Sequence, residues 1–296
     1  PDADCVGAAL GIYRLSKTLG KSTYIVMDKD CPAIEPIVEG IYKERADEEE
    51  DIFVTNEEAL LLKDKSAMLI VVDVNLPAMT ECPELLKSVS TIVVLDHHRQ
   101  NNETIKNAVV SYVEPYASST CEMVAEILQY IVDKPKLKNI EADAMYSGIL
   151  VDTDNFVIKA GVRTFEAAAF LRRAGADVTR VRKMFREDME HCRIRTAIIN
   201  KAEIYMNEFA ISTFDGANVS GATVVGAKAA NALLNIQGIR GSFVLTSLQD
   251  LIYISARSID ELNVQVIMEK FNGGGHLTMA AAQLKDVTLE EAKRQL

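Results

Sequence analysis

The chain has 296 residues, of which 48% are hydrophobic and 25% charged, a balance typical of a folded globular protein long enough for two domains. No apolar run approaches the roughly 18 residues that a bilayer-spanning helix needs, which argues against membrane contact within these residues, and no secretory signal is visible. The formal net charge of −11 argues against a long nucleic acid as partner, whereas a small phosphorylated ligand could bind where metal ions neutralise its site.

The start of the chain and its cysteines indicate what kind of protein it comes from and in which compartment. It opens on Pro1-Asp2, without an initiating methionine, and a helical pattern starts within a few residues. We therefore expect a fragment of a longer protein, with any upstream module or membrane segment outside it. Five cysteines, at 5, 31, 82, 121 and 192, show no paired spacing, which predicts reduced thiols in a cytosolic setting.

The first hundred residues alternate between helical and extended patterns. We predict helices over 4–19, 33–44 and 58–64, and strands over 22–28, 52–55, 67–74 and 91–96. The last two strand segments, A-M-L-I-V-V-D-V and T-I-V-V-L-D, are almost continuously apolar, as in parallel strands covered by helices on both faces. The alternation predicts an α/β domain with a mainly parallel sheet.

The middle of the chain is helical. S-T-C-E (119–122) has the pattern of a capping box, with Ser119 as N-cap, and it opens a predicted helix over 120–132. Further helices are predicted over 140–151, 163–174 and 177–206, the last as one helix or as two joined near residue 188.

The last ninety residues predict a second, smaller α/β domain. Strands fit 209–215, 241–248 and 251–258, with a short Q-D turn between the last two, and helices fit 226–236, 262–271 and 288–296. We therefore expect a first domain over 1–187, a helical connector over 188–207 and a second domain over 208–296.

Acids and histidines follow several apolar runs. In open α/β sheets, ligands bind beyond the carboxyl ends of the strands, so polar residues at those ends are the first candidates for a site. Each acid alone is better explained as a helix cap or turn residue, but several at one edge would need a positive partner. The candidates are Asp2 and Asp4, Asp73, the run Asp96-His97-His98, and Asp152.

No matching set of lysines or arginines accompanies these acids, so we expect divalent metal ions to neutralise them. Carboxylates with imidazoles and no cysteine suit manganese, or a similar ion, more than structural zinc. Two such ions sharing one carboxylate would activate a water and hold the oxygens of a phosphoryl group. This pattern predicts a metal-dependent enzyme acting on a phosphate ester.

A glycine-rich loop in the second domain is the other candidate site. The run G-G-G-H (273–276) could bring backbone N–H groups close to an anion, with His276 as an added donor. Arg257 could reach the same phosphate, because a guanidinium matches phosphate geometry. A turn between two elements and an ordinary surface arginine explain these residues equally well from the sequence.

Together these residues resemble the DHH/DHHA1 phosphoesterase family. The matching motifs, in order, are P-D-A-D-C-V-G-A-A, the acid of L-I-V-V-D, D-H-H itself at 96–98, the acid of G-I-L-V-D-T, and G-G-G-H. The residues in and around these motifs most resemble those of GdpP-type cyclic-di-AMP phosphodiesterases, as in E-P-Y-A-S-S-T-C-E and G-G-G-H-L-T-M-A-A-A-Q. The leading histidine of the family's first motif falls before Pro1.

The resemblance implies a set of roles. Asp2 and Asp73 would hold one manganese ion, and Asp4, Asp73, His97 and Asp152 the other, with Asp73 bridging the two ions. Asp96 and His98 would be the catalytic pair, orienting the site or approaching the leaving oxygen. Arg257, Gly273, Gly274, Gly275 and His276 would bind the nucleotide from the second domain.

The resemblance also implies the reaction, which is hydrolysis of cyclic di-AMP to linear pApA. The substrate would lie between the two domains, and the parent protein would be anchored to the membrane with this portion in the cytosol. A homodimer is left open.

Three alternatives remain from the sequence. The same scaffold supports a nuclease for very short RNA or a pAp phosphatase, and a related inorganic pyrophosphatase shares the amino-terminal motifs but not G-G-G-H. A nucleotide sensor that binds without hydrolysis is the third, and the intact acids Asp73 and Asp152 with His97 argue against it.

Overall fold

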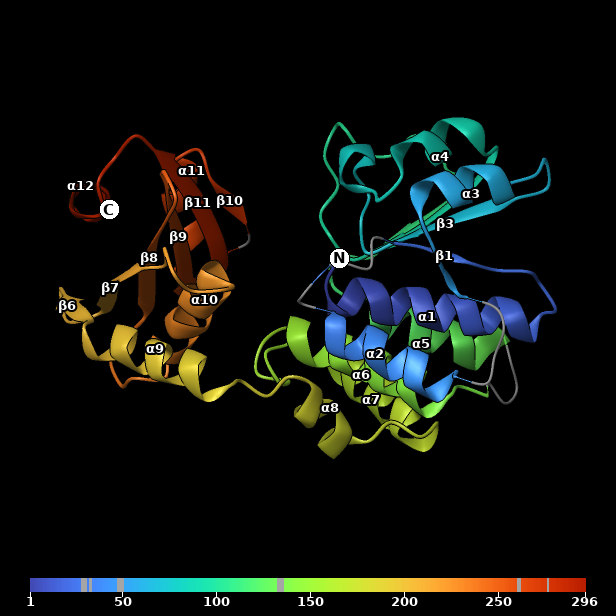
Figure 1. Ribbon diagram of the computed structural model, residues 1–296, viewed down its shortest axis with the longest axis horizontal. Helices are drawn as coiled ribbons and strands as arrows, with labels where there is room; N and C mark the ends of the chain where they lie inside the picture. The colour runs from blue at the N-terminus through green and yellow to red at the C-terminus, as the bar shows by residue number, and fades with distance from the viewer. Residues whose placement is uncertain (28–30, 32–33, 47–50, 132–135, 260–261, 276) are drawn as a thin grey trace. The chain divides into compact units, whose positions relative to one another are not determined.

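The computed structural model describes residues 1–27, 31, 34–46, 51–131, 136–259, 262–275 and 277–296. The chain divides into two compact units, Pro1–Arg186 and Glu187–Leu296, which are coloured from blue to olive and from yellow to red in Figure 1. None of the described helices combines the length and the apolar character that crossing a membrane requires. All five cysteines are free thiols.

Parallel strands form the sheets of the first unit, as predicted. In the three-stranded sheet the order is β3-β4-β5, with Met68 opposite Thr91 and Val72 opposite Leu95, while β1 and β2 pair separately. One face of the β3-β4 pair packs on a helical core through Ile70 and Val93, and the other packs toward α4 through Val94. This double cover explains the continuous apolar runs. The strands are β1 (Ile25–Val26), β2 (Phe53–Val54), β3 (Met68–Val72), β4 (Thr91–Asp96) and β5 (Val110–Val113).

Helices fill the rest of the first unit. The core beneath the sheet is built by α1, α5, α6 and α7 around fully buried side chains such as Leu128, Met145, Ile149 and Leu171. A second cluster packs α2 against α1 and the β1-β2 pair. The helices are α1 (Ala3–Thr18), α2 (Glu35–Glu44), α3 (Asn56–Leu62), η1 (Pro77–Met79), α4 (Pro83–Ser88), α5 (Thr120–Ile131), α6 (Asn139–Asp152), α7 (Val162–Arg173) and α8 (Val178–Met184).

Small residues let α1, α5 and α6 approach one another closely. A Cβ atom at Gly148 would lie 2.6 Å from Cys121 Sγ and 2.8 Å from Asp4 Cα, and one at Gly7 would lie 2.7 Å from the carbonyl oxygen of Ala144. The glycines on α1 and α6 therefore set the distance between these helices. The same contact places Asp4 against the start of α5.

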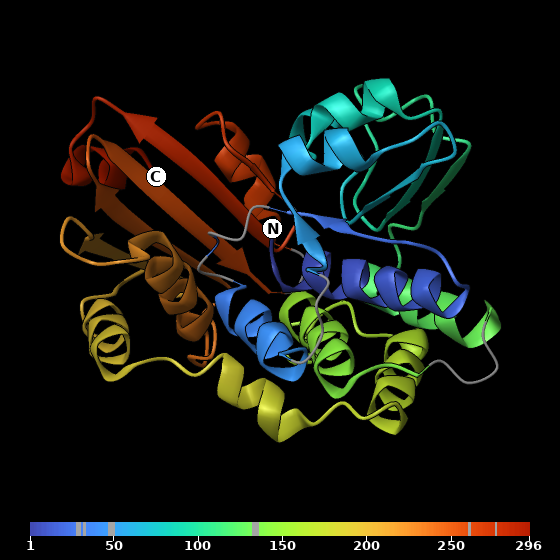
Figure 2. The same cartoon turned by 45° about the vertical axis from the view of Figure 1, so that its right-hand side comes forward.

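The second unit is built on one mixed sheet. Its strand order is β10-β11-β9-β8-β7-β6, and the β7-β8 pair alone is parallel among the described pairings. Helices α9 and α10 cover one face, and α11 and α12 pack on the other (Figures 1 and 2). The elements are α9 (Met189–Asn200), β6 (Glu203–Tyr205), β7 (Phe209–Asp215), α10 (Ala222–Leu233), β8 (Gly241–Leu248), β9 (Leu251–Ser258), α11 (Val264–Glu269), β10 (Gly274–Gly275), β11 (Met279–Lys285) and α12 (Leu289–Gln295).

Several predicted elements need correction. The segment 177–206 forms two helices, α8 and α9, which was one of the two predicted possibilities. Its last residues form strand β6 and not helix. Strands β5 and β11 were missed. Residues 279–285 are rich in alanine, which has low β propensity, and they form a strand because they pair with β9 over seven residues.

We predict that Gly148→Ala destabilises the first unit. The added methyl group meets Cys121 and Asp4 in a tight contact, so separating the helices should cost about 1–3 kcal/mol. Gly161→Ala is the matched control, because a Cβ there has no heavy atom within 4 Å, and it should cost less than about 1 kcal/mol. Urea unfolding of both variants measures this, and equal midpoints would contradict the expectation.

Candidate metal centre

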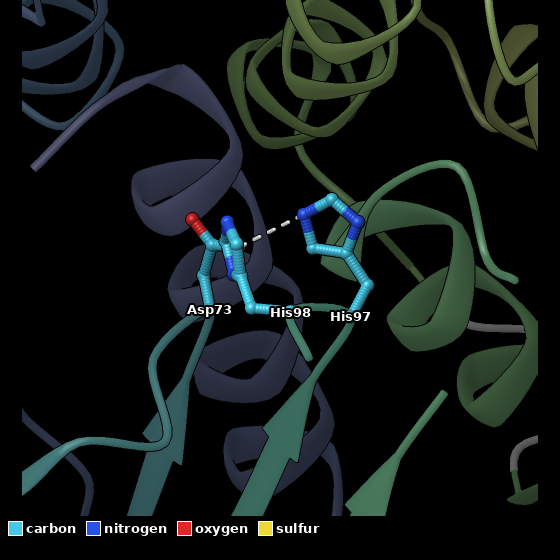
Figure 3. A group of neighbouring side chains, drawn as sticks. All are labelled: Asp73, His97 and His98. Carbon is cyan, nitrogen blue, oxygen red and sulfur yellow. Dashed lines mark ion pairs between the residues drawn. The ribbon is translucent and has the colours of Figure 1, made fainter. Parts of the chain in front are cut away.

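The tips of β3 and β4 carry the polar side chains on which the site is built. Asp73 follows β3 in a left-handed conformation (φ +61°), and its N–H donates to the carbonyl oxygen of Leu95 at 2.9 Å. Asp96 ends β4, and His97 and His98 follow it directly. Figure 3 shows Asp73, His97 and His98 at the ends of these neighbouring strands. Parallel pairing thus joins two motifs that are more than twenty residues apart in the sequence.

His97 lies at the centre of the carboxylates. It is 6% exposed, and its Nε2 lies 3.0 Å from Asp152 Oδ2, 3.5 Å from Asp73 Oδ1 and 3.9 Å from Asp4 Oδ2. Despite these distances, no atom of the described residues makes a well-aligned hydrogen bond with this buried nitrogen. An imidazole nitrogen and several carboxylate oxygens that face one another need protons or a cation between them, and this donor set fits a divalent metal ion.

Two groups of side chains could hold metal ions, and they share His97. One group is Asp4, His97 and Asp152, and the other is Asp73, His97 and His98, each with its ligand atoms within 4.8 Å of one another. The predicted ligand Asp2 is in neither group. It is exposed and is the N-cap of α1, where its carboxylate accepts from the N–H groups of Asp4 and Cys5. Asp152 is the last residue of α6, so this acid follows a helix and not a strand.

The start of α5 holds the buried carboxylate of Asp4. Asp4 Oδ2 accepts from the N–H of Thr120 at 2.7 Å, and Oδ1 accepts from the N–H of Cys121 at 2.8 Å. Thr120 also donates from Oγ1 to Asp73 Oδ1 at 3.0 Å. The unsatisfied N–H groups and the positive dipole end of a helix stabilise an anion in this position.

The contact of Thr120 with two candidate ligands was not predicted, although the helix start at S-T-C-E was the signal for it. The predicted capping box is half formed. Ser119 Oγ accepts from the N–H of Glu122 at 3.1 Å, but the Glu122 carboxylate bonds Ser118 and Thr164 instead of returning to Ser119.

The predicted catalytic pair is held by a third residue that the sequence did not point to. Asp96 is fully buried, and its Oδ1 lies 2.8 Å from His98 Nδ1 and accepts from the N–H of His98 at 3.1 Å. The buried Asn75 donates from Nδ2 to the other oxygen of Asp96 and, at 3.3 Å, to the carbonyl oxygen of His98. Asn75 therefore fixes the carboxylate that orients the His98 ring.

Burial and neighbouring groups shift the pKa values of these acids in different directions. Burial alone would raise the pKa of Asp96, but hydrogen bonds from His98 and Asn75 outweigh it and lower the pKa, so this carboxylate stays ionised. Burial, reinforced by neighbouring carboxylates, raises the pKa of Asp4 to about 6 and that of Asp73 to about 11. At neutral pH, Asp73 therefore holds a proton unless a cation replaces it, whereas Asp4 holds one only below about pH 6.

In the second unit, the glycine run is part of a strand pair. Gly274 and Gly275 form β10, opposite Ala281 and Ala280 of β11. A Cβ at Gly273 or Gly275 would collide with β11 backbone, whereas one at Gly274 would meet nothing within 4 Å. Two of the three glycines are thus needed for close strand pairing. His276 lies outside the described residues.

Arg257 lies on β9, the neighbour of β11 in the same sheet, with Met279 opposite it. Its guanidinium donates from Nε to Asn231 Oδ1 at 2.7 Å and from Nη1 to the carbonyl oxygen of Ala256 at 2.9 Å. Arg257 and the glycine run are therefore brought to the same end of one sheet.

Comparison with known families agrees with this geometry. Residues 1–149 match the N-terminal domain of the DHH family, and residues 210–296 match the DHHA1 domain. The chain therefore belongs to the DHH family, as the resemblance predicted. Among solved structures, the exopolyphosphatase-related protein from Bacteroides fragilis has the same fold, with a TM-score of 0.77 at 20% identity over 99% of this chain and 87% of that one.

Curated relatives show which members of the DHH family this chain resembles. The chain is 42% identical over its full length to the cyclic-di-AMP phosphodiesterase PdeA of Listeria monocytogenes, and 41% identical to the cyclic-di-AMP phosphodiesterase GdpP of Geobacillus thermodenitrificans. It spans 45% of the length of each of these proteins. The similarity to GdpP-type proteins is thereby confirmed.

We predict that manganese stabilises the protein more at pH 8 than at pH 6. Because the folded-state pKa values of Asp4 and Asp73 lie above the ordinary value of 3.8, the folded metal-free protein holds more protons than the unfolded chain. The contribution of these two acids to the stability of the metal-free protein therefore falls as the pH rises above about 4. A divalent cation displaces these protons, so its contribution grows with pH.

Thermal unfolding with and without Mn²⁺ at the two pH values measures this difference. Asp73→Asn should remove most of the manganese effect, since the amide mimics the protonated acid but cannot supply a charged ligand. Asp188→Asn is the control, because Asp188 is an exposed helix cap in the other unit and asparagine also caps helices. A manganese effect that is independent of pH in the wild type would refute the assignment.

Proposed function

We propose that this chain hydrolyses cyclic di-AMP to linear pApA, with two manganese ions held by Asp4, Asp73, His97 and Asp152. The observation that carries the proposal is the convergence of three carboxylates, Asp4, Asp73 and Asp152, on His97 Nε2, a buried nitrogen without a hydrogen-bond partner among the described residues. The names of the curated relatives support the choice of substrate. Membership of the DHH family supports the class of reaction.

The metal ions would supply an activated water and neutralise the phosphate charge. The protein's own residues carry out the remaining tasks. Asp73 Oδ1 lies 3.5 Å from His97 Nε2 and 3.8 Å from His98 Nδ1, and by the family resemblance Asp73 would be the carboxylate that both ions share. Asp2, at the start of α1, would complete the shell from its free oxygen, because its Oδ1 is the oxygen engaged in capping.

His98 and Asp96 are proposed to handle the proton of the leaving oxygen. The ionised Asp96 accepts from His98 Nδ1, which would favour the tautomer protonated at Nδ1 and make Nε2 the ring nitrogen that exchanges the proton. His98 suits this task better than His97 because its side chain is 42% exposed, against 4% for His97. Arg257, Gly273, Gly274, Gly275 and His276 of the second unit would bind nucleotide phosphate or base.

The test is product analysis with cyclic di-AMP, pApA, pAp and pyrophosphate, each with Mn²⁺ and with a chelator. We expect cyclic di-AMP to give pApA only when manganese is present. Cleavage of the linear substrates alone would indicate a short-RNA nuclease or pAp phosphatase, phosphate release from pyrophosphate would indicate a pyrophosphatase, and binding without turnover would indicate a sensor.

We predict that His97→Ala lowers turnover at least about 100-fold, because loss of groups that merely support metal ligands already costs 10–100-fold. His191→Ala is the matched control. His191 lies in the second unit, where its ring contacts Asp188 and the carbonyl oxygen of Ser220, so it should retain activity within about twofold. Wild-type turnover in His97→Ala would exclude the proposed metal mechanism.

A further inference from the structure

One residue at the start of α5 contacts a candidate ligand from each of the two groups that could hold metal ions. The backbone N–H of Thr120 donates to Asp4 Oδ2 at 2.7 Å, and its side-chain Oγ1 donates to Asp73 Oδ1 at 3.0 Å. Asp4 belongs to one of the two groups and Asp73 to the other. Thr120 therefore links two carboxylates that come from separate segments of the chain.

The carboxylate oxygen that the Thr120 hydroxyl contacts is the one that faces the histidines. Asp73 Oδ1 lies 3.5 Å from His97 Nε2 and 3.8 Å from His98 Nδ1 (Figure 3). The backbone of Asp73 is fixed by the hydrogen bond of its N–H to Leu95, but a carboxylate still rotates about two side-chain torsions. A hydrogen bond to Oδ1 restricts this rotation, so the Thr120 hydroxyl keeps this oxygen directed toward the two imidazoles.

The support that carries this hydroxyl is rigid. Thr120 is fully buried, and so are its neighbours Ser119 and Cys121. Ser119 Oγ caps the helix by accepting from the N–H of Glu122 at 3.1 Å, and Leu128 packs the next turns of α5 into the helical core. A donor on such a support needs no reordering when a ligand binds, and this pre-organisation strengthens binding.

The helix itself does not need the Thr120 hydroxyl. Ser119 supplies the cap, and a threonine within a helix ordinarily bonds the carbonyl oxygen of the residue four positions before it. The Thr120 hydroxyl instead reaches a carboxylate 47 residues earlier in the chain. Because threonine is also a mediocre helix former, the contact with Asp73 explains this residue better than helix formation does.

We propose that Thr120 is a positioning residue of the metal centre, which holds the carboxylates of Asp4 and Asp73 in place and thereby raises the affinity for a divalent cation. The inference rests on the proposed function for the metal centre, but not for the identity of the substrate. Hydrogen bonds to ligand carboxylates keep them oriented, and losing such a partner typically lowers metal affinity or activity 10–100-fold. The N–H that binds Asp4 is a backbone group, so a side-chain substitution tests the hydroxyl by itself.

The experiment compares Thr120→Val, Thr120→Ser and Ser119→Ala. Valine keeps the branching of threonine and removes the donor, whereas serine keeps the hydroxyl. Ser119→Ala removes the cap of the same helix, whose hydrogen bond goes to Glu122 and to neither carboxylate, so it measures what weakening of α5 does by itself. If valine prevents folding, Thr120→Ala against Thr120→Ser makes the same comparison, since these two variants differ by a single hydroxyl group.

Calorimetric titration of each metal-free protein with Mn²⁺ measures the affinity, and urea unfolding measures the stability. We expect Thr120→Val to weaken manganese binding about tenfold and Thr120→Ser to weaken it less than about threefold. Ser119→Ala should lower the urea midpoint and leave the manganese affinity within about twofold of the wild type.

Turnover of cyclic di-AMP gives a second readout. For Thr120→Val, the Mn²⁺ concentration that gives half-maximal rate should rise about tenfold, with kcat at saturating Mn²⁺ within about threefold of the wild type, because excess metal fills a weakened site. A purely structural role would lower kcat at every metal concentration and would not raise the concentration of Mn²⁺ required.

Metal binding separates this inference from the proposed function. If Thr120→Val weakens manganese binding but the wild type does not cleave cyclic di-AMP, the proposed function fails and the positioning role stands. Equal affinities in the wild type and in a folded Thr120→Val protein, or an equal loss in Ser119→Ala, would overturn the positioning role and leave the proposed function intact. A wild-type protein that binds no Mn²⁺ would overturn both.

Discussion

The constraint on which the first unit depends is electrostatic. Asp4, Asp73 and Asp152 converge on the buried ring of His97, and like charges so close in a poorly hydrated site repel one another strongly. Two features of the fold offset this repulsion. The first N–H groups of α5 bind Asp4, and protons or divalent cations neutralise the remaining charge. Burial thus disfavours the charges that the site brings together, and a bound divalent cation would resolve this conflict.

Close helix packing makes this arrangement possible. Asp4 reaches the start of α5 because glycines on α1 and α6 let three helices meet where any side chain would collide. Polar contacts fix the β4 side of the site, because Asn75 donates a hydrogen bond to Asp96 and Asp96 is hydrogen-bonded to His98. Backbone strain is tolerated at Asp73 and in the turn after Asp152 because packing and hydrogen bonds on both sides leave these segments no alternative conformation.

The sequence predicted the fold class and most of the elements, because hydrophobic periodicity reports local structure. The continuous apolar runs ending at Asp73 and Asp96 identified buried parallel strands, and the Q-D turn identified the hairpin of β8 and β9. Predictions failed where partners far along the chain decide the outcome. The alanine-rich β11 is a strand because β9 pairs with it, although alanine has low β propensity, and β5 and β6 are only four and three residues long, too short for a periodic pattern to identify them.

The same division holds for the site. The sequence by itself determined which residue types were available, since an acid followed by two histidines after an apolar strand has few structural uses, and the family motifs completed the set. Only the tertiary structure decided which side chains meet. His97 faces Asp4 and Asp152, Asp2 caps a helix, and Thr120 and Asn75 contact candidate site residues. The physical reason is that helix packing and sheet register set the distances between segments, and a local pattern of residues contains no information about either.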